Sequence, residues 1–153
     1  MKPILAPLAS LLFLACCAQA GGPAPSAENA RATVEALFSA FNAHDAAAMA
    51  ALYAPDAELR TSEYCAPLRG RQALERIHVE LFATFPDIQD EVTDYFVDGE
   101  NVAVRFTSRS QIPGRAFEMQ IADFFVVRDG LIVSDHTIFN AGRDCQPAPD
   151  WAG

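Results

Sequence analysis

The chain has 153 residues, of which 51% are hydrophobic and 20% are charged, a balance that is typical of a single globular domain and argues against wholesale disorder. Its 20 acidic and 11 basic residues give a formal net charge of −9. Such a surface repels phosphate backbones, which argues against nucleic acid and anionic membranes as partners. The single lysine, Lys2, lies at the extreme N-terminus. A mature chain without this residue has no lysine for Schiff-base catalysis or for a P-loop, so both are excluded.

Residues 1–20 have the features of a secretory signal peptide. A short positive end precedes an apolar stretch over residues 4–15, and the segment finishes on an A-x-A cleavage signal. The apolar stretch is too short to span a membrane, and no later stretch is long enough. We therefore expect an exported protein, periplasmic or secreted, with a linker over 21–26. The alternative is a lipoprotein anchored through Cys16 or Cys17.

Two cysteines remain in the folded part, Cys65 and Cys145. An even pair in an exported domain predicts a disulfide. Two unpaired thiols are the alternative.

The first half of the domain is mainly helical. Apolar residues recur at helical spacing, and Ser, Asp, Gly and Pro residues mark the ends of the segments. We expect helices over 27–43, 45–53 and 70–85, a short strand over 57–61, and a loop over 62–68.

From residue 88 onward the apolar period changes to two, as in β-strands. Turn signals at Asp98-Gly99, Pro113-Gly114 and Asp129-Gly130 separate four strands. The expected strands are 88–97, 102–111, 116–128 and 131–140. This order predicts an α+β domain over 27–140, without the alternation of a Rossmann fold, followed by a tail over 141–153.

The last hairpin carries the best candidate for chemistry. If Asp129-Gly130 forms a two-residue type I′ turn, Asp123 stands opposite His136 on an apolar face of the sheet. A buried carboxylate needs a partner, and mutual influence would poise this pair for proton transfer near neutrality. The alternative is a buried hydrogen bond with no catalytic role. A one-residue change of register would instead pair Asp123 with Asp135.

Other polar residues give weaker signals. His78 lies beside the apolar face of the helix predicted over 70–85, and we interpret it as a residue at the edge of the core. His44 is interpreted as a solvated turn residue. Three histidines scattered over nearly a hundred positions have no metal-ligand spacing, so no metal site is predicted.

The opposite face of the last hairpin is also apolar, at Phe124, Val126, Leu131, Val133 and Phe139. Three helices can cover only one side of the sheet, so we predict a homodimer that packs sheet on sheet.

Four segments between residues 32 and 140 resemble the nuclear transport factor 2-like superfamily, in particular its SnoaL-like and ketosteroid isomerase-like branch. They are Ala43-His44-Asp45, Leu52-Tyr53-Ala54-Pro55-Asp56-Ala57, Gly70-Arg71-Gln72-Ala73-Leu74 and Asp123-Phe124-Phe125-Val126-Val127-Arg128-Asp129-Gly130-Leu131-Ile132. The resemblance implies a curved, mixed or antiparallel sheet wrapped by three helices into a cone with a deep pocket. It says little about activity, because the superfamily includes enzymes and non-catalytic binding modules.

The resemblance argues against ketosteroid isomerisation by the known mechanism. The positions of the base, the oxyanion-hole tyrosine and the oxyanion-hole aspartic acid fall on Thr61, Leu37 and Ala122, so all three functional groups are missing. SnoaL-type polyketide cyclases are more similar, since their acid-base work is assigned to an aspartate with a histidine. Asp123 and His136 are the residues here that match those roles.

The resemblance also implies a wall that binds a small, largely apolar molecule without a cofactor. The candidate wall residues are Phe41, Tyr53, Thr61, Phe82, Phe117, Met119, Phe125, Ser134, Ile138 and Asn140. Each of them is equally compatible with a packed core. Two functions therefore stay open: a cofactor-free proton-transfer enzyme of the isomerase or lyase type, and a ligand-binding or protein-interaction module without turnover.

Overall fold

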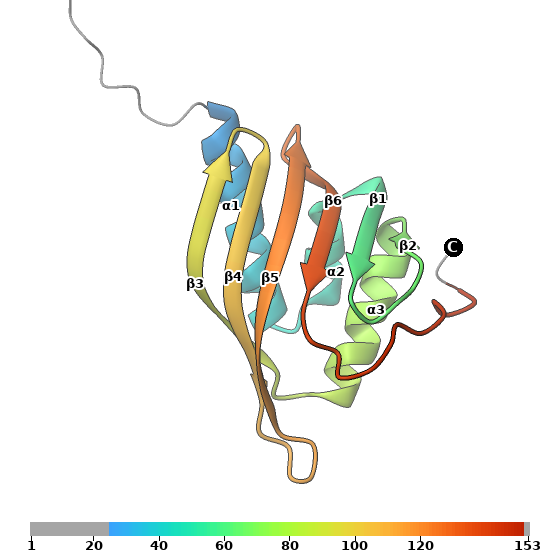
Figure 1. Ribbon diagram of the computed structural model, residues 1–153. Coiled ribbons are helices and arrows are strands. Elements are labelled where there is room, and N and C mark those ends of the chain that lie inside the picture. The colour runs from blue at the N-terminus through green and yellow to red at the C-terminus, as the bar shows by residue number, and fades with distance from the viewer. Residues whose placement is uncertain (1–24, 152–153) are drawn as a thin grey trace, which may run out of the picture.

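The computed structural model describes residues 25–151 (Figure 1), so the predicted signal peptide and most of the predicted linker lie outside the described residues. The helices are α1 (Pro25–Asn42), α2 (Ala46–Ala51) and α3 (Arg71–Thr84). The strands are β1 (Tyr53–Thr61), β2 (Leu68–Arg69), β3 (Gln89–Asp98), β4 (Asn101–Ser110), β5 (Phe117–Arg128) and β6 (Leu131–Ile138). None of the helices in this described part is long and apolar enough to cross a membrane.

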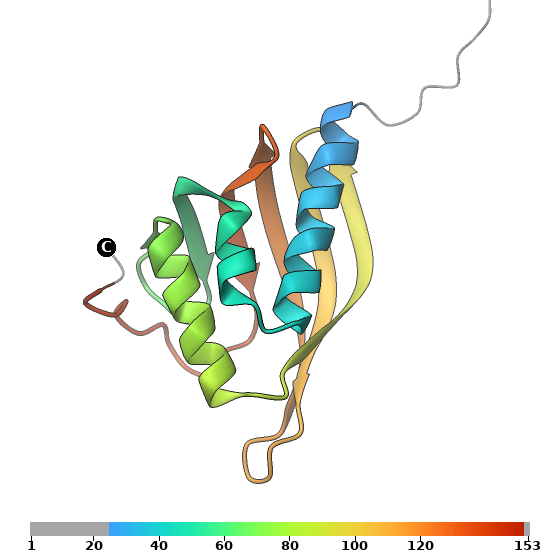
Figure 2. The same ribbon diagram turned by 180° about the vertical axis from the view of Figure 1, so that it is seen from behind.

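The strands form one curved sheet in the order β2-β1-β6-β5-β4-β3. Neighbouring strands are antiparallel except β1 and β6, which are parallel. All three helices lie on the same side of the sheet, and the other side is left uncovered within the described residues (Figures 1 and 2). The predicted α+β fold with its mixed, curved sheet is confirmed.

The turn chemistry explains the long meander from β3 to β6. Asp129 and Gly130 have φ angles of 51° and 77°, which is the left-handed backbone of a type I′ turn. Arg128 therefore stands opposite Leu131, as predicted. The turn fixes where the last hairpin begins.

The junction between the second helix and the first strand differs most from the sequence prediction. The second helix ends at Ala51 instead of continuing to residue 53, and β1 starts at Tyr53 and runs through Pro55. The pairing of β1 with β6 is irregular between Tyr53 and Glu58, so the missing N–H of proline is tolerated there. The two-residue strand β2 was not expected, because two residues carry no periodic signal.

The core lies between the helices and the inner sheet face. Val34, Leu74 and Ile132 are fully buried there. The ring of Phe38 on α1 packs edge-on against Phe106, with 4.9 Å between ring centroids. This packing holds α1 over the β3, β4 and β5 part of the sheet, whereas α3 lies over β1 and β2 at the other end.

Candidate functional site

A β-bulge in β6 decides which polar side chains enter the interior. Val127 pairs with Ile132, but Val126 pairs with Ser134, so Val133 is an extra residue in β6. Beyond such a bulge every side chain of the strand changes face. The predicted pairing of Asp123 with His136 is therefore wrong.

In the structure Asp123 stands opposite Thr137, and Phe124 stands opposite His136. His136 is exposed on the outer face, whereas Asp123 and Asp135 are 6% and 4% exposed and face the interior. A two-carboxyl pair thus occupies the place of the predicted carboxyl-imidazole pair. The alternative register, with Asp123 opposite Asp135, does not occur either, because Asp135 stands opposite Phe125 and meets Asp123 only as a diagonal neighbour on the same face.

Hydroxyl groups from two strands hold the carboxyl pair in place. The Tyr53 hydroxyl on β1 donates to Asp135 Oδ2 at 2.5 Å. The Thr137 hydroxyl lies 3.2 Å from Asp123 Oδ2 and 3.4 Å from Asp135 Oδ1, and the backbone N–H of Phe124 donates to Asp123 Oδ1 at 3.0 Å. Asp123 and Asp135 also form a hydrogen bond with each other.

The electrostatics of the pair follow from burial. Burial raises the pKa of Asp123 well above its ordinary value, and the charge of Asp135 raises it further. Burial also raises the pKa of Asp135, but hydrogen bonds from Asp123 and Tyr53 oppose that rise. Two buried carboxyls in contact cannot both ionise cheaply. The pair therefore favours a state with one shared proton, with Asp123 as the acid and Asp135 as the carboxylate.

His78 on α3 belongs to the same interior site. Burial lowers the pKa of its imidazole, and the nearby charge of Asp135 acts in the opposite direction. Its Nδ1 lies 2.7 Å from the carbonyl oxygen of Leu74. Since a carbonyl only accepts, Nδ1 carries the proton, and Nε2 of the neutral ring is an acceptor. The sequence prediction of a boundary residue missed this placement.

These groups line a cavity of about 670 Å³ between the helices and the sheet. Its wall is mainly apolar and aromatic, and Tyr53, His78, Asp123, Asp135 and Thr137 form a polar patch on it. The exposed lining residues mark the mouth, and they are Glu80 and Thr84 on α3 and Arg143 in the tail. The volume is in the range of pockets that bind small organic molecules.

Six of the ten predicted wall residues line this cavity: Phe41, Tyr53, Thr61, Phe117, Met119 and Phe125. The other four do not. Phe82 packs behind the wall, against Phe41 at 5.2 Å between ring centroids. The bulge turns Ser134 to a shallow groove on the outer face and leaves Ile138 46% exposed. Asn140 is exposed and accepts a hydrogen bond from the Gly142 N–H.

The predicted disulfide is confirmed, and it holds the tail near the cavity mouth. Cys65 and Cys145 are bonded, with 5.0 Å between their Cα atoms. Beside it, the Cys65 N–H donates to the Gln146 carbonyl at 2.9 Å and the Gln146 N–H donates to the Glu63 carbonyl at 2.8 Å. Arg143 pairs with the Glu63 carboxylate at 3.0 Å. The tail is thus an ordered part of the mouth.

Comparison with solved structures places this geometry in a family. Wild-type IdmH, a candidate polyketide cyclase from Streptomyces antibioticus, is 30% identical, with a TM-score of 0.64 over 72% of this chain and 91% of that one. A loop-truncation variant of IdmH is 32% identical, with a TM-score of 0.65 over 72% and 92% of the two chains. A candidate SnoaL-like polyketide cyclase from Jannaschia sp. CCS1 shares the fold at 16% identity, with a TM-score of 0.70 over 78% and 91%.

A search of curated proteins finds no match. A family model described as a SnoaL-like domain matches residues 34–135, which include α2, α3 and the first five strands completely. The match extends through Asp123 to Asp135 of the carboxyl pair. This chain belongs to the SnoaL-like domain family.

Proposed function

We propose that this protein is an exported SnoaL-like domain that binds a small, largely apolar molecule in its cavity and transfers a proton on it without a cofactor. The observation that carries the proposal is the buried carboxyl pair on the wall of an otherwise apolar cavity. The similarity to IdmH supports the same type of reaction, because IdmH is described as a candidate polyketide cyclase.

The roles of the pair follow from its single shared proton. Asp135, the carboxylate, accepts a proton from an acidic carbon of the bound molecule. Asp123, the acid, donates its proton to the oxygen on which negative charge develops, and the pair again holds one proton afterwards. Tyr53 holds Asp135 in place through its hydroxyl, and the apolar wall keeps bulk water away from the reacting atoms.

The second candidate function is binding without turnover. The same pair then only satisfies its own hydrogen bonds, and the cavity stores or carries its ligand. This alternative is favoured by the full set of hydrogen bonds that Asp135 receives within the fold.

The first experiment identifies the ligand. Native mass spectrometry of the protein purified from the periplasm, followed by denaturing extraction, detects any co-purified small molecule. The extracted molecule is then incubated with the protein in D₂O, and NMR follows the exchange of its carbon-bound hydrogens.

Proton transfer predicts exchange with the wild-type protein and a loss of about 10²-fold or more in Asp123→Asn. His136→Ala is the matched control, because this side chain lies on the outer face, and it is expected to leave exchange unchanged. A retained ligand with no exchange in the wild-type protein refutes turnover and leaves the binding module.

Export is supported by the disulfide, since such bonds persist in oxidising compartments. Processing after residue 20 is the form we propose, and the lipoprotein alternative through Cys16 or Cys17 is tested by the same mass measurement. An acylated cysteine at the N-terminus would overturn soluble export.

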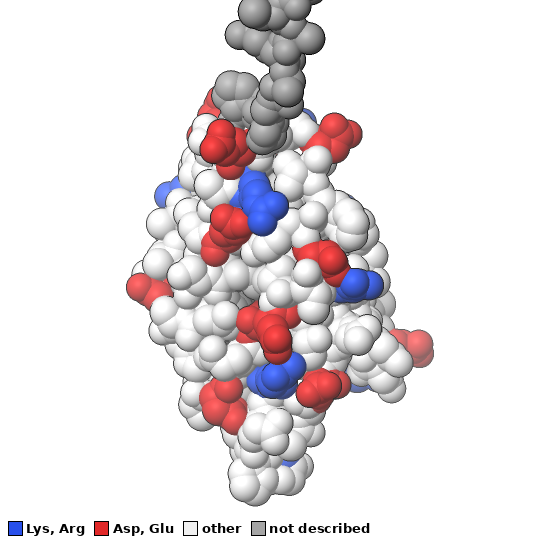
Figure 3. Space-filling model, turned by 90° about the vertical axis from the view of Figure 1, so that its left-hand side faces the viewer, with Lys and Arg blue, Asp and Glu red and all other residues white. Residues whose placement is uncertain are grey.

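We also propose a homodimer through the uncovered face of the sheet. Phe96, Phe124 and Ile138 are 63%, 47% and 46% exposed on the strands of this face, and apolar area of this kind marks an interface. Charged side chains of both signs are interspersed around the β3 edge (Figure 3), which opposes pairing of that edge with another chain. A second copy therefore packs face to face.

A further inference from the structure

A further carboxyl group, that of Asp90 on β3, lies on the cavity wall away from the Asp123 and Asp135 pair. It stands opposite Ser108 on β4, and Ser108 stands opposite Met119 on β5. Asp123 is four residues farther along β5, so the two acidic sites lie about 13 Å apart along the strands and about 10 Å apart across them, before curvature. A ligand that fills the cavity can contact both.

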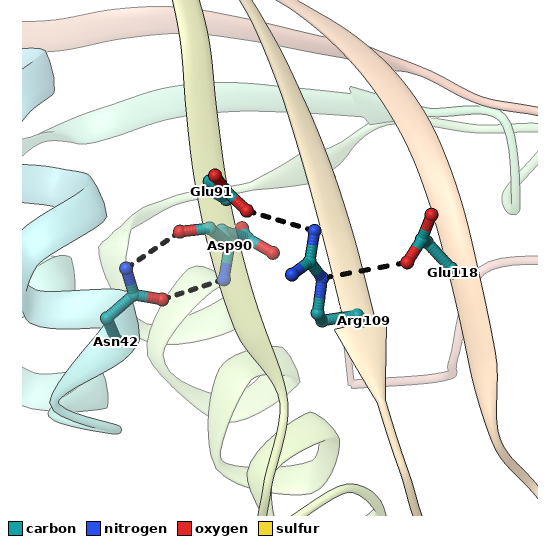
Figure 4. A network of polar contacts seen from close by, with 5 residues as sticks. All are labelled: Asn42, Asp90, Glu91, Arg109 and Glu118. Carbon is teal, nitrogen blue, oxygen red and sulfur yellow. Dashed lines mark hydrogen bonds and ion pairs between the residues drawn. The ribbon is translucent and has the colours of Figure 1, made fainter.

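The backbone of Asp90 is fixed by α1. The Asn42 side chain donates to the Asp90 carbonyl and accepts from the Asp90 N–H, both at 2.8 Å, as Figure 4 shows. These two bonds bind the end of α1 to the start of β3. They satisfy the backbone of Asp90 and leave its carboxyl group to the cavity side.

The carboxyl group of Asp90 is only partly satisfied. Asp90 is 9% exposed, and its Oδ1 accepts no hydrogen bond from any residue in the described part of the chain. Burial raises its pKa to about 7, and a hydrogen bond from Ser108 opposes that rise. An unpaired buried carboxyl is costly, so this position favours a ligand that brings its own donor.

Nearby charged side chains do not neutralise Asp90. Arg109 on β4 pairs with Glu91 at 2.9 Å and approaches Glu118 at 3.9 Å (Figure 4). Glu91 is the next residue after Asp90 in β3, so alternation places this ion network on the opposite face of the sheet. The complement of Asp90 therefore has to come from the cavity.

The rest of the cavity wall also favours a cation. Its acidic members are Glu63, Glu80, Asp90, Asp123 and Asp135. Among the described lining residues the one arginine, Arg143, is already paired with Glu63. The rings of Phe38 and Phe106 pack together at 4.9 Å on the same wall, and Phe106 is two residues from Ser108. Aromatic faces next to a carboxylate attract an ammonium group.

We propose that Asp90 and Ser108 form a subsite for a protonated amine on an otherwise apolar ligand. This inference deepens the proposed function, on whose apolar cavity it rests. The ammonium group donates to the Asp90 carboxylate, while the apolar body of the ligand extends along the aromatic wall toward Asp123 and Asp135. The ligand class is a hydrophobic amine.

The test compares two probes of nearly equal shape, 2-(1-naphthyl)ethylamine and 2-(1-naphthyl)ethanol, by isothermal titration calorimetry. We expect the wild-type protein to bind the amine at least tenfold more tightly than the alcohol at pH 8.5. Asp90→Asn is expected to abolish this preference and keep alcohol binding, which also shows that the variant is folded. Asp98→Asn removes an equal charge from the same strand outside this cavity and is expected to keep the preference.

The pH dependence gives a second measurement that needs no variant. The amine stays protonated from pH 5.5 to 8.5, whereas Asp90 ionises near pH 7. Amine affinity is therefore expected to fall about 30-fold from pH 8.5 to 5.5, and binding at pH 7 is expected to release about half a proton. Asp90→Asn removes both effects.

Other titratable groups sit on the elements that surround Asp90. They are His44 after α1, His78 on α3, Asp87 before β3, Glu91 on β3 and Arg109 on β4. They remain in Asp90→Asn, as do Asp123 and Asp135 on the same cavity wall, so a pH effect that survives in this variant belongs to one of these groups and overturns the assignment to Asp90.

Three other outcomes overturn the proposal. Equal binding of amine and alcohol to the wild-type protein refutes the subsite while the apolar cavity stands. A preference for the amine that survives in Asp90→Asn, or disappears in Asp98→Asn, shows that bulk charge is responsible. No amine binding at millimolar concentration refutes the subsite as well, whereas hydrogen exchange on an extracted ligand tests the proton-transfer proposal separately.

Discussion

Replacing Asp123 with asparagine tests the shared proton of the carboxyl pair directly. Asparagine has nearly the shape of a protonated aspartic acid, and its amide can donate to Asp135 as the acid does. The variant is therefore expected to fold. In it Asp135 remains a carboxylate, because the amide, Tyr53 and Thr137 all supply neutral donors.

The magnitude follows from proton counting. Burial raises the pKa of Asp123 well above the value of the unfolded chain, so above about pH 5 the folded pair holds one proton that the unfolded chain does not. The unfolding free energy of the wild-type protein then falls by about 1.4 kcal/mol per pH unit from this pair alone. This stabilisation is complete at acidic pH and is lost as the pH rises toward the raised pKa. The variant lacks the proton and lacks this slope.

Urea denaturation followed by far-UV circular dichroism at pH 5.5 and 7.5 measures the difference. The wild-type protein is expected to lose stability relative to Asp123→Asn over this interval, by up to about 1.4 kcal/mol for each pH unit below the raised pKa of Asp123. Asp90, which also titrates in this range, is present in both proteins and cancels in the comparison. Parallel stability curves for the two proteins would refute a proton shared within the pair.

Three further perturbations test other parts of the structure. Replacing Cys65 and Cys145 with serine opens a crosslink with a sequence separation of 80, and the loss in urea denaturation is expected to approach about 4.5 kcal/mol by chain entropy; an unchanged midpoint would contradict this. Tyr53→Phe removes a donor from the buried Asp135 carboxylate, which is expected to cost about 1.5 to 3 kcal/mol in the same assay. Phe124→Glu places a charge on the uncovered face, so size exclusion with light scattering is expected to show a monomer where the wild-type protein is a dimer; two identical masses would argue against the proposed interface.

The fold was predictable because its signals are local and repeated. The helical spacing of Val34, Leu37 and Phe38 marks the buried face of α1, and all three are buried in the structure. The Asp129-Gly130 turn specifies the start of the last hairpin through its backbone conformation alone. Elements without such signals were missed, as the two-residue strand β2 shows.

The site was less predictable because β6 has polar residues on both faces. Register is strongly specified only where one face is consistently apolar. Within residues 134–137, one register of the strand turns Asp135 toward the interior and the other turns His136 toward it. Both registers therefore place an ionisable group inside. The bulge at Val133 changes the register after a correctly predicted turn, and no local residue pattern marks it. His78 was missed for a related reason, since only tertiary packing brings α3 to the β6 carboxylate.

One extra residue in β6 thus determines the character of both sheet faces. Without the bulge, alternation would place His136 inside beside Asp123 and Asp135 outside. With it, the interior receives a second acid, and one proton has to be retained to limit the cost of two buried charges. The outer face receives His136 next to Phe124, where an imidazole at the proposed dimer interface costs less than a carboxylate would. The same backbone irregularity therefore makes the cavity acidic and keeps the outer face suited to a second copy.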